Sequence, residues 1–271
     1  MTASAAAFFR NPQSVYPMLT VEHIRAYDRD GFVLVPNVFT PEEVEILLAQ
    51  AGRERRGGTV HNVTDAGGRM SKLAAWTDIA DDVFGAVTAS PRIVGAAQLL
   101  LREEIYHWHS KLSVKQPRAG AAWEWHQDYG YWYNDGCLYP NMISCMVALD
   151  PSTRENGCLK VVAGSHLLGR CDHGRVASQT GADPERLATV LERLPVQYCE
   201  APPGSVLFFH CNTFHSSEPN LSEKPRRAYI CCYNALSNLP YGGKGHGKPE
   251  PIRQAPDDAI LRYEASVGTP A

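Results

Sequence analysis

The chain has 271 residues, of which 44% are hydrophobic and 20% charged, and its formal net charge is -3. This composition suits one substantial hydrophobic core, so we treat residues 1–271 as a single domain. The small net charge provides no electrostatic footprint for nucleic acid or an anionic membrane. No run approaches about 18 consecutive apolar residues, and the first residues lack the basic region and long apolar core of a signal peptide. We therefore expect a cytoplasmic protein.

The first part of the chain is rich in predicted helices. The clearest start signal lies at Thr40, which is an N-cap residue followed by Pro41 in the first turn and by Glu43, which completes a capping box. In chain order, the predicted elements of this part and of one later insertion are a helix at 20–31, a strand at 32–36, a helix from 40, a helix at 91–101 and a helix at 183–194.

Strands dominate the middle and the second half. Residues 105–111 alternate with period two, and further runs are rich in β-branched and aromatic residues and end at Gly, Pro or Asn. These runs are 142–149, 158–162, 205–209 and 228–233. Helices do not alternate with strands here, which argues against a doubly wound α/β fold. The pattern predicts a mainly β core with flanking helices.

A short metal-binding pattern stands in the middle of the chain. His126 and Asp128 are two residues apart, and on an extended strand such residues point to the same side and can hold one metal ion. A third ligand is available in the stretch that contains His210 and His215, and Arg226 follows His215 by eleven residues. Two imidazoles and one carboxylate on one face of a metal leave three positions open, as in non-haem Fe(II) oxygenases. The pattern therefore favours oxygen chemistry.

Three longer stretches surround these residues. They are 123–132 (WEWHQDYGYW), 155–166 (ENGCLKVVAGSH) and 215–226 (HSSEPNLSEKPR). In this order and at this spacing the chain, from about residue 20 to about 235, resembles the phytanoyl-CoA dioxygenase superfamily. That superfamily includes ectoine hydroxylase and many hydroxylases of secondary metabolism. One departure is Ala163, where the family often has Pro, and it affects nothing catalytic.

The resemblance implies a fold, a metal and a co-substrate. The fold is a double-stranded β-helix, or jelly roll, with helices packed outside. The metal is Fe(II), held by His126, Asp128 and His215, and the reaction consumes 2-oxoglutarate and O2. The resemblance puts the distal carboxylate of 2-oxoglutarate on Arg226. It also assigns three further residues to the same pocket, namely Ser217, which helps hold the co-substrate, and Trp123 and Ser113, which line it.

The resemblance also implies a reaction. We expect a dioxygenase that hydroxylates or otherwise oxidises a small-molecule metabolite and releases succinate and CO2, in a monomer or homodimer. Iron halogenases of the superfamily carry a small residue at the position of Asp128, so the carboxylate here favours hydroxylation, desaturation or ring formation. The alternatives are a cupin-like isomerase or hydrolase that uses no 2-oxoglutarate, and a non-catalytic metabolite-binding barrel. Arg226 and Ser217 argue against the first, and the complete ligand set argues against the second.

Other residues compete for these roles. His210 is a rival to His215, but the spacing to the arginine favours His215, and we expect His210 either to support the metal ligands without touching the metal or to serve packing. Arg227 adjoins Arg226, but neighbours on a strand face opposite sides, so we expect only Arg226 to enter the barrel. His107 and His109 share one strand face and are a second possible metal pair, although hydrogen bonding inside the barrel is the favoured interpretation. We expect His166 to hold its turn through a hydrogen bond.

Several features leave more than one interpretation. Tyr129, Tyr131, Trp132 and Tyr133 form either core packing or a substrate wall. The Gly-rich segments 55–69 and 241–248 are either ordinary surface loops or loops near the barrel mouth. A coenzyme A thioester would require a basic surface patch, and the three residues available are Lys111, Lys115 and Arg118, so a free metabolite is favoured. The eight cysteines contain no C-x-x-C pair and are expected to be reduced.

Overall fold

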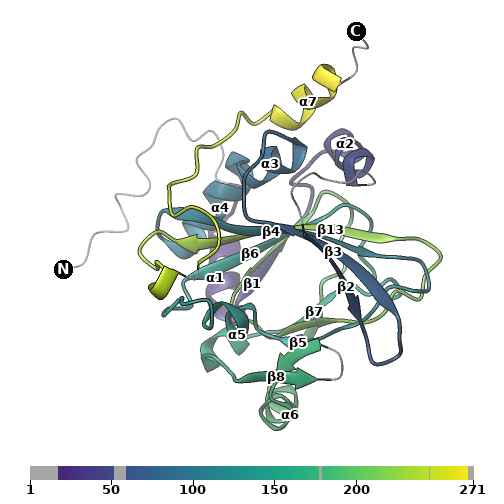
Figure 1. The fold of residues 1–271 in the computed structure, drawn as a ribbon, viewed down its shortest axis with the longest axis vertical. Coiled ribbons are helices and arrows are strands. Elements are labelled where there is room, and N and C mark those ends of the chain that lie inside the picture. The colour runs from purple at the N-terminus through teal and green to yellow at the C-terminus, as the bar shows by residue number, and fades with distance from the viewer. Residues whose placement is uncertain (1–17, 52–58, 177–178, 244, 268–271) are drawn as a thin grey trace.

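The computed structural model describes residues 18–51, 59–176, 179–243 and 245–267. Two antiparallel sheets face each other around a central space (Figure 1). The larger sheet contains, in spatial order, β1 (Phe32–Val35), β11 (Val206–His210), β6 (Met142–Ala148), β13 (Arg226–Ala235), β4 (Ile105–Lys115), β3 (Met70–Trp76) and β2 (Thr59–Thr64). The smaller sheet contains β10 (Val196–Tyr198), β7 (Leu159–Val162), β12 (His215–Ser217) and β5 (Trp123–His126). The mainly β, jelly-roll fold expected from the sequence is confirmed.

Helices cover the outer face of the larger sheet and the outside of the smaller one (Figure 1). They are α1 (Val21–Asp30), α2 (Pro41–Ala51), α3 (Val83–Thr88), α4 (Pro91–Leu101), α5 (Asp128–Trp132), α6 (Pro184–Arg193) and α7 (Ala259–Val267), with short 3-10 turns η2 (Ser165–Leu168) and η3 (Tyr241–Gly243). A separate hairpin, β8 (His173–Val176) with β9 (Gln179–Ala182), lies next to β5.

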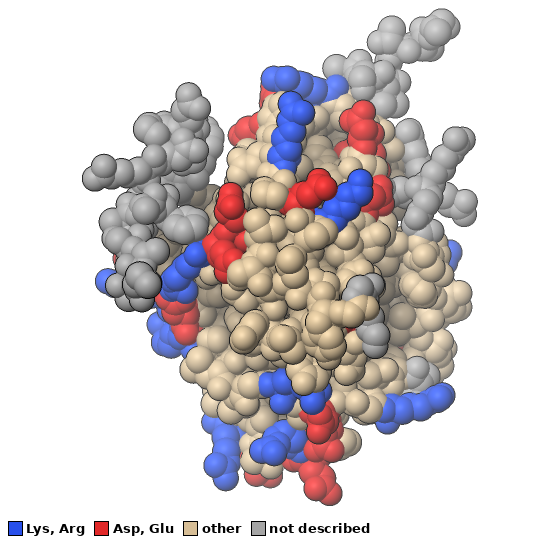
Figure 2. All heavy atoms as spheres, turned by 60° about the vertical axis from the view of Figure 1, so that its left-hand side comes forward, with Lys and Arg blue, Asp and Glu red and all other residues tan. Residues whose placement is uncertain are grey.

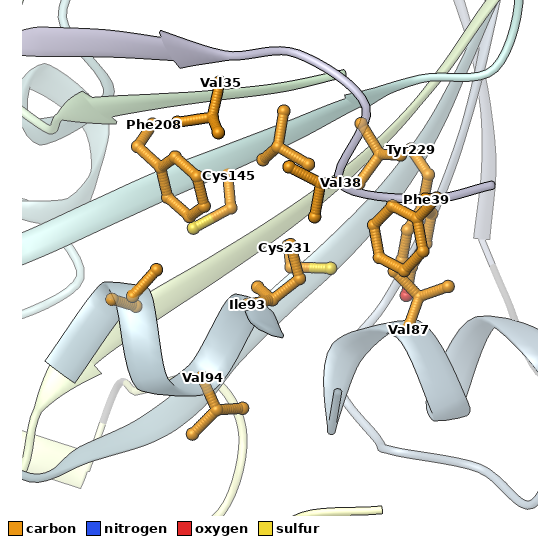
Figure 3. Close-up of a cluster of buried hydrophobic side chains, with 14 of the residues drawn as sticks. Val35, Val38, Phe39, Val87, Ile93, Val94, Cys145, Phe208, Tyr229 and Cys231 are labelled. Carbon is orange, nitrogen blue, oxygen red and sulfur yellow. The ribbon is translucent and has the colours of Figure 1, made fainter. Parts of the chain in front are cut away.

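The main hydrophobic core lies between the larger sheet and helices α3 and α4 (Figure 3). Phe208 and Cys231 project from the sheet, and Ile93 and Val87 project from the helices to meet them. All four side chains are fully buried. Burial of this apolar surface is the main stabilisation of the fold.

The segment Val83–Leu101 is apolar enough by composition to span a membrane, with a mean hydropathy of 1.3 over its most apolar window. In the structure 67% of that window is buried, and the segment is divided into α3 and α4, with Ser90 capping the second helix. These helices supply Val87 and Ile93 to the core, so the apolar composition has an explanation within the fold.

The helix signals in the sequence correspond to real caps. At the start of α2, the Thr40 N–H donates to Glu43 Oε2 and the Glu43 N–H donates to Thr40 Oγ1, which is the predicted capping box. Helix α1 ends at Gly31, which adopts φ 82°, a left-handed conformation that glycine reaches without strain. Helices α4 and α6 begin and end within one residue of their predicted bounds.

Some elements were not predicted from the sequence. Strand β2 is almost entirely exposed, so it shows no alternation of apolar and polar residues that would mark a strand. It pairs with β3 through a turn at 65–69, where the Arg69 N–H donates to Asp65 Oδ1 over 2.9 Å. The Gly-rich segment 55–69 is therefore a hairpin from residue 59 onward, and residues 55–58 lie outside the described part. The eight cysteines are all free, as expected, and all eight are buried.

Candidate metal centre and active-site cavity

Three potential metal ligands converge inside the barrel. Strands β5 and β12 are neighbours, and their register places His126 directly opposite His215. Asp128 follows β5 by two residues. The ligand atoms of the three side chains all lie within 4.8 Å of one another, with His215 Nε2 at 3.9 Å from Asp128 Oδ1. One metal ion fits among these three donors.

Hydrogen bonds orient each donor toward the shared space. His126 Nδ1 lies 2.7 Å from the Glu124 carbonyl oxygen, and His215 Nδ1 lies 2.9 Å from the Thr213 carbonyl oxygen. A ring nitrogen must donate to a carbonyl, so both Nε2 atoms keep a lone pair for a metal. The Ser144 hydroxyl donates to Asp128 Oδ2 over 2.6 Å, which leaves Oδ1 free.

The protonation states also suit metal binding. Burial, reinforced by His215, lowers the pKa of His126 to about 3, and burial lowers the pKa of His215 as well. Burial alone would raise the pKa of Asp128. Neighbouring groups outweigh burial and lower the pKa of Asp128 below its usual value, and the positive charge of Lys111 is the largest of their effects. At neutral pH the site therefore contains two neutral imidazoles and one carboxylate, which are the forms that bind a divalent metal.

The sequence-based prediction of the local backbone was wrong at one point. Asp128 and the aromatic residues after it do not continue a strand, because Asp128 begins helix α5. Gln127, between the two ligands, is extended, and its N–H donates to His173 Nε2 over 2.9 Å. Its side-chain amide also donates to the Asn212 carbonyl at 2.8 Å. The sequence gives no sign of this contact of His173, because it joins residues 46 positions apart.

Arg226 lies at one end of the same cavity. Its side chain is 3% exposed, one terminal nitrogen donates to the Gly157 carbonyl at 2.8 Å, and its Nε is buried without a hydrogen-bond partner. Among the described residues no carboxylate lies within ion-pairing distance of it. Arg227 faces the other way and forms a two-pronged ion pair with Asp150, with both distances 2.8 Å. The two arginines thus lie on opposite faces of β13, as strand alternation predicted.

The cavity encloses about 570 Å3 of space, including its open mouth. It contains every residue that the sequence had proposed for the site. Its lining residues are Leu73, Lys111, Ser113, Trp123, His126, Asp128, Met146, Leu159, Phe209, His215, Ser217, Arg226 and Ile230. The cavity therefore combines the ligand cluster with a polar end, which contains Arg226 and Ser217, and with an apolar wall.

Lys115 was missed as a site residue. Its side chain is 0% exposed, and its Nζ donates to the Ser217 hydroxyl over 2.7 Å and to the Glu218 carbonyl. Burial, together with the nearby Arg226, lowers the pKa of Lys115 to about 6. Lys115 therefore supports the position of Ser217.

The small basic surface patch considered from the sequence does not form. Lys115 is interior, Lys111 lines the cavity, and Arg118 pairs with Glu223 at the surface. The face turned forward in Figure 2 has a broad central area without charged side chains, and its blue and red side chains lie mostly near one another at the edges.

The rival histidines lie outside the ligand cluster. His210 packs near Tyr27 and His166, and burial lowers its pKa to about 4. His107 lies 2.8 Å from the Ser110 hydroxyl, in agreement with hydrogen bonding rather than metal binding. His166 Nε2 contacts the Asp28 carbonyl at 3.2 Å, so it ties its turn to α1.

The aromatic residues after the ligand pair divide between the two interpretations. Tyr129 and Trp132 are buried in a core cluster with Trp108. Tyr131 lies beside the His126 ring, with a centroid distance of 5.6 Å, and its hydroxyl donates to the Thr180 carbonyl over 2.6 Å. Tyr131 is therefore a neighbour of the ligand cluster, whereas Tyr129 serves packing.

Comparisons with known proteins agree with this site. The family model for phytanoyl-CoA dioxygenase matches residues 27–228. Ectoine dioxygenase from Bordetella bronchiseptica is 30% identical over 236 residues, covering 81% of this chain and 77% of that enzyme. L-proline trans-4-hydroxylase from Streptomyces griseoviridis is 30% identical over 233 residues, covering 79% and 86%. The crystal structure of EctD from S. alaskensis with 2-oxoglutarate and 5-hydroxyectoine has a TM-score of 0.72 at 26% identity, covering 88% of each chain.

These matches, with the fold and the ligand cluster, define the class of protein. It is a 2-oxoglutarate-dependent non-haem iron dioxygenase, an oxidoreductase. Within that class, the chain belongs to the phytanoyl-CoA dioxygenase family.

Proposed function

We propose that this protein oxidises a small-molecule metabolite, most simply by hydroxylation, with conversion of 2-oxoglutarate and O2 to succinate and CO2. The observation that carries the proposal is the meeting of two features in one cavity. One is the His126, Asp128 and His215 cluster, and the other is Arg226, which is buried without an acidic partner among the described residues.

His126, Asp128 and His215 would hold the iron. The donor set fits Fe(II), because both Nε2 atoms and one carboxylate oxygen are left free by the hydrogen bonds that orient them. When bound, Fe(II) supplies open coordination positions at which the co-substrate and O2 meet. Asp128 fills the position that a halide would need, so we favour hydroxylation or a related oxidation over halogenation.

Arg226 would bind the distal carboxylate of 2-oxoglutarate. A buried guanidinium without an acidic partner is costly, and its fork geometry matches a carboxylate with parallel charge-assisted hydrogen bonds. Ser217 lies at the same end of the cavity, where Lys115 fixes its hydroxyl. Trp123 and Ser113 line the cavity and would border the co-substrate.

The substrate we propose is a free metabolite acted on in the cytoplasm, by an enzyme that is a monomer or homodimer. Two relatives of the chain are named for ectoine and L-proline, which are small molecules. The interior positions of Lys111 and Lys115 remove two of the three residues that a surface site for coenzyme A would use.

The test is an anaerobic titration of the metal-free protein with Fe(II), with and without 2-oxoglutarate. A keto acid chelated to Fe(II) gives a weak charge-transfer band in the visible. We expect this band with 2-oxoglutarate, and succinate formation once air is admitted. Iron binding without the band would overturn the co-substrate assignment and favour a cupin-like enzyme, and a failure to bind iron would reopen the non-catalytic barrel.

A further inference from the structure

The turn 210–213 leads from the end of β11 to β12 and carries the acceptor that orients His215. The Thr213 carbonyl oxygen lies 2.9 Å from His215 Nδ1, and the Thr213 N–H donates to the His210 carbonyl over 2.9 Å, which closes the turn. Strand pairing fixes the backbone of His215, whereas the rotation of its ring follows the position of the Thr213 carbonyl. The direction of His215 Nε2 therefore depends on what holds this turn.

One support of the turn is the residue that ends helix α1. The Gly31 carbonyl accepts two hydrogen bonds from the turn, one from the backbone N–H of His210 and one from the Thr213 hydroxyl, each over 2.9 Å. Thr213 is fully buried, so water does not replace the bond of its hydroxyl. A Cβ at Gly31 would lie 2.4 Å from His166 Nδ1, so this close approach requires glycine. The turn thus rests on the end of α1 through backbone groups and one side chain.

A second support of the turn is Gln127, the residue between two of the ligands. Its Nε2 donates to the carbonyl groups of Asn212 and Gly169, both over 2.8 Å, and its Oε1 accepts from the Cys171 N–H over 2.7 Å. The side chain is fully buried, and both protons of its amide are used. Gln127 is therefore held in one orientation and fixes the Asn212 carbonyl of the turn.

These bonds join the two segments that carry the ligands. The Tyr129 N–H donates to the Cys211 carbonyl over 3.0 Å, and the Gln127 amide bonds the next residue of the turn, so Asp128 lies between two attachments to the turn. His215 Nε2 is 3.9 Å from Asp128 Oδ1. A displacement of the turn would change this separation, because the turn holds the His215 ring and is itself tied to both sequence neighbours of Asp128.

The residue types at positions 127 and 213 are those that the contacts require. The side chain at 127 must donate two hydrogen bonds and accept one, which an amide does. A glutamate would turn acceptors toward two carbonyl groups, and an asparagine is one methylene shorter. The side chain at 213 must donate to a carbonyl, which serine also does and valine does not. Substitutions at these positions can therefore remove one attachment of the turn at a time.

We propose that Gln127 and Thr213 are positioning residues of the metal centre, which hold the turn 210–213 so that His215 and Asp128 face one metal ion before it binds. The inference rests on the proposed function, because it takes these two residues as metal ligands. Neither Gln127 nor Thr213 lines the cavity, so neither touches substrate. Removal of a group that orients a metal ligand weakens metal binding by about 10- to 100-fold.

The test is equilibrium binding of Co(II) to the metal-free protein without oxygen or 2-oxoglutarate. Co(II) accepts the same nitrogen and oxygen ligands as Fe(II), and its visible absorption reports the number and geometry of the ligands. Thr213→Val removes the hydroxyl with little change in size, and we expect its Kd for Co(II) to rise about 10-fold with altered bands. Thr213→Ser keeps the hydroxyl and is expected to restore the wild-type bands and a Kd within about 2-fold of wild type.

The second attachment is tested in the same way. Gln127→Met keeps the length of the side chain without its hydrogen bonds, and we expect the Kd for Co(II) to rise about 10- to 100-fold. Gln197→Met is the matched control, since Gln197 is exposed on β10, and it should bind Co(II) like the wild type. A wild-type Kd with wild-type bands in Gln127→Met or in Thr213→Val would overturn the role of that residue.

A stability control separates positioning from general loosening of the fold. Val87→Ala shortens a buried side chain of α3 in the main core, away from the metal centre, and should lower the Tm without changing the Kd or the bands. A rise of the Kd that follows the loss of Tm in all variants alike, Val87→Ala included, would overturn the proposal. A wild-type protein that binds neither Co(II) nor Fe(II) would instead count against the proposed function.

Discussion

The two faces of strands β4 and β13 differ in what they contribute. On the outer face, Tyr229 and Cys231 pack under α3 and α4, and Arg227 is paired with Asp150. On the inner face, Arg226 and Lys111 have no acidic partner in ion-pair contact among the described residues, although they come from the same strands. A fold tolerates unpaired interior charge only where packing elsewhere supplies the stability, and unpaired groups of this kind mark a binding site. The outer face stabilises the barrel and the inner face is available for chemistry.

The largest expected effect is in the cavity that this inner face lines, at residues that the smaller sheet and α5 contribute. His126→Ala or Asp128→Ala should abolish iron binding and turnover, because each removes one of three metal donors. The free energy of unfolding should change by no more than about 1 kcal/mol, since the ligands contribute little to the core. Iron content and succinate formation, with thermal unfolding as the fold control, check this. Retained activity in either variant would refute the ligand assignment.

The converse change is on the outer face of the same larger sheet, at Phe208 of β11. Phe208→Ala should lower the free energy of unfolding by about 3–5 kcal/mol, because it opens a cavity in the core of Figure 3. Turnover per folded molecule should stay near wild type at low temperature. Urea unfolding and turnover, measured on the same samples, test these two expectations. Phe208→Leu is the milder control. A selective loss of turnover in the folded protein would mean that the two faces are coupled.

A smaller effect concerns Lys115, because burial lowers the pKa of its amine from the usual 10.5 to about 6. Between these values the unfolded chain binds the proton and the folded chain does not, so the stability of the metal-free protein rises with pH across this window. The rise is at most about 1.4 kcal/mol per pH unit. Urea unfolding at several pH values between about 6.5 and 9 should show this slope in the wild type and a reduced slope in Lys115→Met. The same dependence of stability on pH in the wild type and in Lys115→Met would contradict a Lys115 amine that is buried and neutral.

The smallest effect on function is expected at His210. His210→Ala should keep iron and the charge-transfer band, because the side chain lies with Tyr27 and His166 rather than in the ligand cluster. It should cost about 1–3 kcal/mol of stability, as the Asn212 N–H loses its acceptor. The check is the iron content of His210→Ala compared with that of His126→Ala, which is expected to have none. Loss of iron in His210→Ala would make it a rival ligand after all.

Local signals in the sequence predicted the elements that they directly encode. The Thr40 capping box and Gly31 mark helix ends through contacts within a few residues, and the apolar run ending at His210 marks β11. The candidate ligand residues were recognisable because their motif is short and its family resemblance is specific, and the structure brings these three side chains together. Such signals do not depend on distant parts of the chain.

Other features depend on contacts far apart in the sequence. The strand at 105–111 was predicted too short, and its extension to Lys115 would have placed Lys111 and Lys115 on one face by period-two alternation. His173 supports the ligand pair only because the β8–β9 hairpin folds against β5. The exposed strand β2 carries no hydrophobic pattern, since its side chains face water.

The most direct test of the claim that inner-face charge binds the co-substrate uses the adjacent arginines. Anaerobic 2-oxoglutarate titrations of Fe(II)-loaded Arg226→Ala and Arg227→Ala, followed by the charge-transfer band, compare the two faces at one point on β13. We predict that Arg226→Ala loses the band or requires at least about 30-fold more 2-oxoglutarate, equivalent to about 2 kcal/mol, whereas Arg227→Ala titrates like the wild type. Equal affinities in the two variants, or loss of the band only in Arg227→Ala, would contradict the assignment.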